Sequence, residues 1–309
     1  MNQSIRTADD LKGAEAAGLA SLYPEKLKIL VGSASCGLAV GARDIEAAAL
    51  SAVKELGLDA VVARTGCIGF CSQEPLLDLV VPDGPRISYG NMTPEKTKSL
   101  LAAFAKNGDL RPDLALARFA GEEHILTGEA HTYPPPAKAV AVLPEWSSLP
   151  FYLHQKKVIL RNCGAIDPLS IEEAIARGAY RGVVRALTEM APDEVIDEVA
   201  NSGLRGRGGA AFPTGQKWRF ARQAAGETKY VVCNADEGEP GAYMDRTVLE
   251  GDPHAVLEGM LIGAYAIGAR EGFIYVRSEY PLAIETLHAA IGDAEVVDVQ
   301  QRGHAVVPR

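Results

Sequence analysis

The first third of the chain alternates short apolar runs with one longer segment of helical periodicity. Residues 27–31 and 58–63 are apolar runs of strand length, and residues 42–56 between them carry apolar side chains at the spacing of an amphipathic helix. This order predicts a β-α-β unit. A hairpin and a further helix are predicted to follow, over residues 77–82, 86–89 and 94–106.

The rest of the chain contains a stretch with few apolar residues, followed by a second region with both helical and strand patterns. Apolar residues are few between Glu122 and Ser148, where three prolines stand together at residues 134–136, and this composition is typical of a tether. Apolar strands are predicted to begin at Tyr230 and at Phe273. We therefore predict four parts, namely a helical leader over residues 1–25, a first α/β domain over 26–115, a linker over 116–154 and a second α/β domain over 155–309.

Glycines and cations are concentrated in residues 203–217, and together they suit a phosphate-bearing ligand. The segment holds five glycines, two arginines and a lysine. Because glycine has no Cβ, backbone N–H groups can approach an anion closely, and the cationic side chains add positive charge. The aromatic residues Phe212, Trp218 and Phe220 suggest a ring stacked beside the phosphate. We interpret this glycine segment as a cradle for a nucleotide or a flavin.

Two familiar phosphate-binding loops do not fit the glycine segment. A Walker loop requires Gly-x4-Gly-Lys-Ser/Thr, whereas Gly209 and Gly215 are one residue too far apart and Trp218 stands where the hydroxyl residue is needed. A Rossmann fingerprint follows an apolar strand, whereas this segment follows the helical pattern of residues 192–202. A mobile surface loop is the structural alternative, and such loops rarely carry several aromatic residues together.

The predicted strand at Tyr230 ends in a polar, acidic turn. Asn234, Asp236, Glu237 and Glu239 bring one amide and three carboxylates to this strand end. Such groups accept hydrogen bonds from ribose or ribityl hydroxyls and from a carboxamide. A solvated acidic turn is the alternative, and the glycine segment that precedes it favours the binding interpretation.

These motifs resemble the flavin- and NADH-binding subunit family of respiratory complex I. The same core occurs in the diaphorase subunits of NAD-linked hydrogenases and formate dehydrogenases. The resemblance is carried by Gly203–Gly241, in which residues 205–218 read Arg-Gly-Arg-Gly-Gly-Ala-Ala-Phe-Pro-Thr-Gly-Gln-Lys-Trp, and by Gln155–Pro168 and Asp245–His254. It extends from about residue 155 to about residue 290.

The resemblance implies which residues hold the cofactors FMN and NAD(H). Phe212 and Phe220 match aromatic residues on the NADH side, and Glu239 matches a carboxylate near the nicotinamide. Hydride would pass from NADH to flavin N5, with the protein supplying orientation and electrostatics and no catalytic acid or base. The residues implied for FMN are Gly206, Arg207, Gly208, Lys217, Asn234, Asp236 and Glu237.

The element order of the first domain resembles a thioredoxin-like ferredoxin domain, which often precedes this flavin core. The expected fold class is therefore α/β, a thioredoxin-like domain followed by the first part of an FMN/NADH-binding domain. Related ferredoxin domains hold a [2Fe–2S] cluster with four thiolates. Cys36, Cys67 and Cys71 occupy cluster-like positions, but residues 31–35 offer no fourth cysteine. Two alternatives stay open, a cluster completed by a serine or an external ligand, and a domain without a cluster.

Composition and charge indicate the compartment of the protein and exclude some classes of partner. Five cysteines, an odd number, do not describe a disulfide framework, and we interpret Cys163 and Cys233 as small core residues. The net charge of −9 argues against a nucleic-acid partner. Without a membrane-length apolar run or a signal-peptide pattern, we expect no membrane insertion and a cytoplasmic protein, peripheral on the inner membrane face through partner subunits.

Two functions from different classes follow. The first is an electron-input flavoprotein subunit of an NADH dehydrogenase (quinone) or another NAD-linked redox complex, which passes electrons to iron–sulfur partner subunits; quinone-, hydrogenase-, formate dehydrogenase- and ferredoxin-linked complexes share this front end. The second is a non-catalytic truncated or assembly module that needs a second polypeptide to bind flavin. The family's flavin fold continues further, and residues 292–309 do not resemble its continuation, so we expect an incomplete flavin domain.

Overall fold

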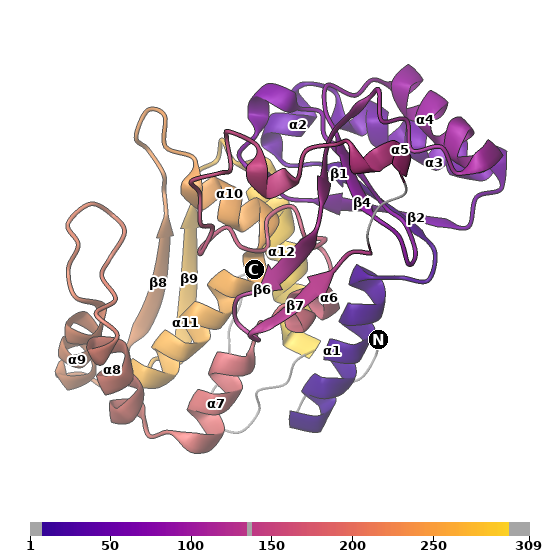
Figure 1. Ribbon diagram of the computed structural model, residues 1–309. Coiled ribbons are helices and arrows are strands. Elements are labelled where there is room, and N and C mark those ends of the chain that lie inside the picture. Colours follow the sequence, from indigo (N-terminus) through magenta and orange to yellow (C-terminus); the bar gives the residue numbers. More distant parts are fainter. Residues whose placement is uncertain (1–7, 135–137, 297–309) are drawn as a thin grey trace. The chain divides into compact units, whose positions relative to one another are not determined.

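The computed structural model describes residues 8–134 and 138–296 (Figure 1). Part of the predicted tether and most of the unfamiliar tail therefore lie outside the described residues. The chain divides into two compact units. The N-terminal unit consists of Ala14–Gly178 and Thr247–Asp252, and the C-terminal unit consists of Ala179–Arg246 and the described residues from Pro253 onward, with those up to Gly13.

The N-terminal unit is built on a five-stranded sheet in the order β2-β1-β3-β4-β5. Strands β1 and β2 are parallel, and the other neighbours are antiparallel. All six residues of β1 are buried, as expected of an interior strand of the sheet. The strands are β1 (Leu27–Gly32), β2 (Ala60–Thr65), β3 (Leu77–Val80), β4 (Arg86–Tyr89) and β5 (Ala115–Phe119).

The predicted β-α-β unit, hairpin and helix are all present, so the thioredoxin-like fold class is confirmed. Helix α3 (Ala42–Leu56) connects the two parallel strands, and its buried residues Ile45, Ala49 and Ala52 pack into the sheet core. The remaining helices of this unit are α1 (Ala8–Leu22), which begins before Ala14, α2 (Ser35–Ala39), η1 (Cys71–Gln73), α4 (Pro94–Asn107), α5 (Lys138–Ala141), η2 (Trp146–Ser148) and α6 (Ile171–Ala176).

The segment that we expected to be a linker, residues 116–154, contains most of β5 and further ordered elements. A small antiparallel pair, β6 (Gly121–His124) and β7 (Glu129–Thr132), follows the large sheet. Trp146 stacks on Phe119 with ring centroids 4.9 Å apart, so aromatic contacts fix the segment to the sheet despite its sparse apolar pattern.

The C-terminal unit contains a two-stranded parallel sheet, β8 (Tyr230–Ala235) and β9 (Glu271–Val276), which lie side by side in Figure 1. Helix α11 (Pro253–Ile267) precedes β9, and its residue Ala266 packs with Val195, Ile196 and the half-buried Trp218 in a small core. The other helices are α7 (Arg181–Glu189), α8 (Pro192–Asn201), α9 (Thr214–Gln223), α10 (Met244–Gly251), within which the two units divide, and α12 (Pro281–Val296). No described helix is long and apolar enough to cross a bilayer.

One face of the two-stranded sheet is exposed and apolar. Tyr230 and Val232 of β8 are 51% and 61% exposed, and Phe273 and Tyr275 of β9 are 42% and 62% exposed. Parallel strands are normally covered on both faces. The pair therefore presents an apolar surface that protein would normally cover.

Candidate functional site

The glycine segment forms a closed loop between α8 and α9. Two backbone hydrogen bonds hold its base, from Gly206 N to Phe212 O and from Thr214 N to Leu204 O, each 2.9 Å long. The residues between these bonds are exposed. A Cβ added at Gly208 would meet nothing within 4 Å, so the space beside the tip is open. This open, glycine-rich tip fits a phosphate-bearing group such as that of FMN.

The cations around the loop fall into two groups. Arg219 and Arg222 form ion pairs with acidic residues of α8, at 2.5 and 2.8 Å between nitrogen and oxygen, and these bonds join α9 to α8. Arg207 and Lys217 are exposed, and no hydrogen bond or ion pair within the described residues engages either side chain. Their charges are therefore available to an anion at the loop.

The aromatic residues divide between surface and core. Phe212 and Phe220 are 46% and 56% exposed, with ring centroids 6.5 Å apart. Trp218 instead packs against α11, where a Cβ at Gly263 would approach its ring to 3.3 Å. The structure thus brings together the two rings that the sequence placed on the NADH side, and it uses the third for packing. A recess of about 460 Å³ beside Phe220 lies at the base of the loop.

The acidic turn presents three of its four predicted side chains to solvent. Asn234, Asp236 and Glu239 are exposed at the end of β8. The Asn234 side-chain oxygen accepts a hydrogen bond from Asp236 N at 3.2 Å, which turns the chain sharply. These groups remain accessible to a ligand's hydroxyl or amide groups.

Glu237 is only 5% exposed, and its hydrogen bonds connect the acidic turn to neighbouring segments. Its carboxylate accepts hydrogen bonds from Asp245 N and Arg246 N, at 2.9 and 3.2 Å, at the first turn of α10. The Tyr280 hydroxyl donates to the same carboxylate, and Arg277 donates to the Glu237 carbonyl at 2.5 Å. Sequence reasoning missed Arg277 and Tyr280, which follow β9 and lie beside the turn because β9 is paired in parallel with β8.

The three cysteines of the N-terminal unit converge, as their cluster-like positions predicted. Cys36 lies on α2, Cys67 follows β2 and Cys71 begins η1. All three sulfur atoms lie within 4.8 Å of one another. Gly69 N donates to the Cys67 sulfur at 3.3 Å, and burial raises the pKa of the Cys67 thiol. The set fits three ligands of a soft metal centre.

Two nearby serines that the sequence left open as a fourth ligand already have partners. The Ser35 hydroxyl donates to Glu250 at 2.5 Å, and the Ser33 hydroxyl donates to the Val31 carbonyl at 3.2 Å. Cys163 is buried and its sulfur donates to a backbone carbonyl, while Cys233 is half-buried. Neither belongs to a group of potential metal ligands in the described part of the chain.

Side chains from outside the loop between Cys67 and Cys71 hold the central residues of that loop in place. The carbonyl of Ile68 accepts hydrogen bonds from the Tyr152 hydroxyl at 3.2 Å and from Lys157 Nζ at 2.9 Å. Phe70 stacks on Phe151 with centroids 4.8 Å apart. Burial lowers the pKa of Lys157. Phe151 and Tyr152 lie in the predicted linker, and Lys157 lies just after it. The sequence analysis assigned none of these three residues to a site.

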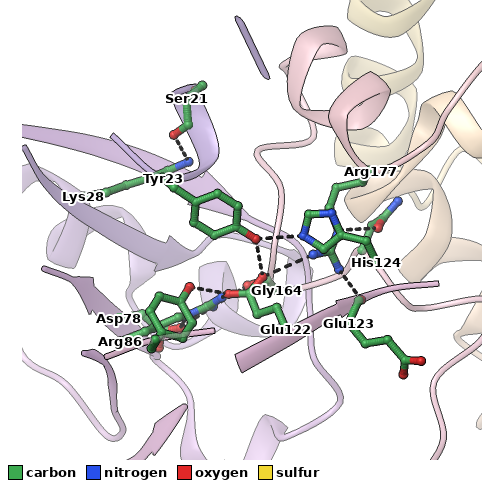
Figure 2. A network of polar contacts seen from close by, with 12 residues as sticks. Ser21, Tyr23, Lys28, Asp78, Arg86, Glu122, Glu123, His124, Gly164 and Arg177 are labelled. Carbon is green, nitrogen blue, oxygen red and sulfur yellow. Dashed lines mark hydrogen bonds and ion pairs between the residues drawn. The ribbon is translucent and has the colours of Figure 1, made fainter. Parts of the chain in front are cut away.

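The N-terminal unit also contains a buried network of polar side chains (Figure 2). Arg86 donates to Asp78 and to Glu122, with ion-pair distances of 2.5 Å, and Arg177 reaches Glu122 at 3.3 Å. Burial alone would raise the pKa of Glu122, but the charges of the two arginines outweigh it and hold that pKa at about 2. The network is charge-balanced and structural.

One family model matches a stretch that includes both the glycine segment and the acidic turn. Residues 199–307 match the Nuo51 FMN-binding domain. A 140-residue stretch is 59% identical to the NADP-reducing hydrogenase subunit HndC of Solidesulfovibrio fructosivorans, covering 45% of this chain and 28% of that one. The resemblance to the flavin-binding subunit family is confirmed.

Two further relatives are NADH-quinone oxidoreductase subunits. One from Rhizobium meliloti is 50% identical over 137 residues, 44% of this chain and 32% of the relative, and one from Escherichia coli is 44% identical over 129 residues, 41% and 29%. Each match thus spans less than a third of the relative's length. The family match also includes residues 292–307, so the prediction that this segment departs from the family is wrong.

Proposed function

We propose that this chain is the electron-input flavoprotein part of an NAD-linked redox complex. In this role hydride passes between NAD(H) and FMN, and electrons continue to iron–sulfur partner subunits. The observation that carries the proposal is the open glycine loop, with the unpaired cations Arg207 and Lys217, inside a segment that matches an FMN-binding domain.

Nine of the ten predicted cofactor residues keep their proposed roles. Gly206, Arg207, Gly208 and Lys217 would hold the phosphate end of FMN, and Asn234 and Asp236 would accept hydrogen bonds from its hydroxyls. Phe212, Phe220 and Glu239 would serve NAD(H). We propose that Glu237 acts on the flavin indirectly, because its carboxylate already binds the first turn of α10.

The chain's own residues orient the reaction rather than perform it. FMN, when bound, supplies the hydride-accepting chemistry. Lys217 and Arg207 neutralise phosphate charge, and the two exposed phenylalanines offer apolar surface to a ring. Glu239 can accept a hydrogen bond from a carboxamide. No proton transfer by a protein side chain is needed.

The finer assignments rest on the relatives' names. Hydrogenase and NADH-quinone oxidoreductase subunits both support an NADH dehydrogenase-type role with iron–sulfur partners, the quinone-linked form among them. By the same resemblance we place the protein in the cytoplasm, peripheral to the membrane through its partners. For Cys36, Cys67 and Cys71 we keep both alternatives, a [2Fe–2S] cluster with an external fourth ligand and a domain without a cluster.

A second candidate function is a non-catalytic truncated or assembly module that binds flavin only when a second polypeptide completes it. The apolar face of Tyr230, Val232, Phe273 and Tyr275 favours this candidate, because such a face is normally covered.

Flavin binding by the purified chain separates the two candidates. The chain is mixed with FMN, freed of unbound flavin, and examined for bound-flavin absorbance with and without a second polypeptide that corresponds to the part of the relatives that this chain does not match. Flavin that is retained and reduced by NADH supports the first candidate. Flavin that is retained only with the second polypeptide and is not reduced by NADH supports the module, and no flavin in either case contradicts both.

A further inference from the structure

A cavity of about 270 Å³ lies within the N-terminal unit, away from the glycine segment in sequence. Its wall is formed by strands β1, β3, β4 and β6, by the end of β2 and by residues between 146 and 165. Four cationic residues line it, Arg86, Lys157, Arg161 and Arg177. Neither the glycine segment, the acidic turn nor the cysteine set explains this concentration of positive charge.

The carboxylates of the wall form ion pairs with only two of its four cations. Asp78 and Glu122 are paired with Arg86 and Arg177, as Figure 2 shows. The Glu123 carboxylate points away from this network, and only its carbonyl meets Arg177. The fourth acidic residue, Glu74, is 7% exposed and accepts a hydrogen bond from Leu76 N at 2.8 Å.

Lys157 and Arg161 have no carboxylate partner among the described residues. Lys157 Nζ donates to the Ile68 carbonyl and lies 4.9 Å from the centre of the Tyr152 ring. Arg161 donates to a backbone carbonyl at 3.2 Å, and its buried Nε has no partner. Cations held in a recess without a counter-charge are costly, and an anion would offset that cost.

Thr65 supplies a further donor without a partner. Its side chain is in the cavity wall and the residue is only 8% exposed, yet its hydroxyl makes no hydrogen bond in the part of the chain that the structure describes. A buried hydroxyl normally has a partner, so one is expected inside the cavity.

We propose that this cavity binds a small oxyanion, a phosphate- or carboxylate-bearing molecule. Lys157 and Arg161 provide the charge, and the Thr65 hydroxyl donates a third hydrogen bond. An oxyanion accepts hydrogen bonds from all three groups at once, whereas a neutral ligand would leave the two cations uncompensated. The residues of this site belong to the N-terminal unit and those of the proposed flavin site to the C-terminal unit, so the proposal does not rest on flavin binding.

Inorganic phosphate is the probe for this site. The full chain is titrated with phosphate against chloride at constant ionic strength, and binding is followed by calorimetry and by the melting temperature. We expect saturable binding that Lys157→Gln weakens about tenfold, the usual effect of losing one charge-assisted contact. Lys156→Gln is the matched control, because Lys156 is exposed and outside the cavity wall, and it should change the affinity less than about twofold.

Three further variants keep the test decisive. If Lys157→Gln fails to fold, Thr65→Val and Arg161→Gln should each weaken phosphate binding in its place. Lys217→Ala removes the cation of the glycine segment, so phosphate binding that persists in this variant does not occur at that segment. The proposal is overturned if phosphate does not saturate, if Lys156→Gln and Lys157→Gln weaken binding equally, or if only Lys217→Ala removes it.

Discussion

Ala211 has a φ of 51°, in the left-handed region that favours glycine. Its carbonyl accepts a hydrogen bond from Arg205 at 3.0 Å, which helps to keep the loop in this conformation. We expect Ala211→Gly to raise the free energy of unfolding by about 0.5–1 kcal/mol, because glycine adopts this φ without steric cost. Urea denaturation measures the change. Ala210→Gly, next to it at an ordinary φ, should instead lower stability, and an equal loss in both variants would contradict the strain.

Lys217 should contribute directly to FMN retention. Its ammonium group has no partner among the described residues, so an FMN phosphate would be its first charged contact. We expect Lys217→Ala to raise the FMN dissociation constant at least tenfold, equivalent to the roughly 1.5–3 kcal/mol of a charge-assisted bond. Fluorescence titration in the presence of the second polypeptide measures it. Lys98→Ala, an exposed lysine in the other unit, is the control, and equal effects would remove Lys217 from the flavin site.

Glu74 should make stability depend on pH. Burial raises its pKa from 4.5 to about 7, so the folded protein binds this proton more tightly than the unfolded chain does. Stability from this group therefore falls as the pH rises from 4.5 through 7 and is constant above. Glu74→Gln removes the decline and should stabilise the protein at pH 8 by up to about 3 kcal/mol.

Melting temperatures of the parent, Glu74→Gln and the exposed control Glu227→Gln, measured from pH 4 to 8, check this expectation. A parent curve that parallels the Glu74→Gln curve over this range would mean that Glu74 is not held protonated by the fold.

Residues that the sequence assigned to the same site differ in exposure. Arg207 and Lys217 are open to a ligand, whereas Glu237, which belongs to the same acidic motif as Glu239, is buried against α10. Nothing local distinguishes Glu237 from Glu239, because the difference arises from Arg277 and Tyr280, far along the chain. The local sequence pattern does not reveal hydrogen bonds between segments that lie so far apart along the chain.

At the scale of elements, strong periodicity located the helices and strands well. Helix α3 spans the predicted residues 42–56, and β1 extends the predicted strand by one residue to Gly32. Strands β6 and β7 were missed because each is only four residues long and mostly polar. Short, polar strands depend on their pairing, which the sequence pattern does not show.

The three-cysteine element should hold iron and sulfide weakly. Cys36, Cys67 and Cys71 supply three thiolates, and the nearby serines are engaged elsewhere, so one iron position depends on a foreign ligand. We expect anaerobic reconstitution to give a cluster that is largely lost on gel filtration, and Cys67→Ser to abolish it. Iron analysis and visible absorbance measure this, with Cys233→Ser as the unaffected control. A full [2Fe–2S] complement that survives gel filtration would show that a fourth strong ligand exists.

At the scale of the whole molecule, the sequence predicted the family but not what covers the C-terminal sheet. The fingerprint of residues 205–218 is specific enough to identify the flavin-binding relatives. Tyr230 and Phe273 are exposed because no element in the described part of the chain covers that face of the β8–β9 pair, and no local pattern reveals this. Whether an apolar side chain is covered depends on partners outside the segment that carries it.

We expect the 309-residue chain alone to bind FMN weakly and to self-associate. The apolar face of Tyr230, Val232, Phe273 and Tyr275 is exposed on a two-stranded parallel sheet, and each match spans less than a third of the relative's length. A dinucleotide pocket buries most of its ligand and needs groups from opposing walls. The glycine segment and the acidic turn supply the groups of one wall only among the described residues.

The test adds, as a second chain, a polypeptide corresponding to the part of the relatives that this chain does not match. FMN occupancy and NADH:ferricyanide turnover should appear only in the mixture, and sedimentation should show that the mixture is less aggregated than the chain alone. Val232→Lys and Tyr275→Lys should reduce self-association by placing charge on the apolar face, without restoring flavin binding. A monodisperse chain with full FMN occupancy and rapid turnover by itself would contradict this prediction, because its own residues would then complete the pocket.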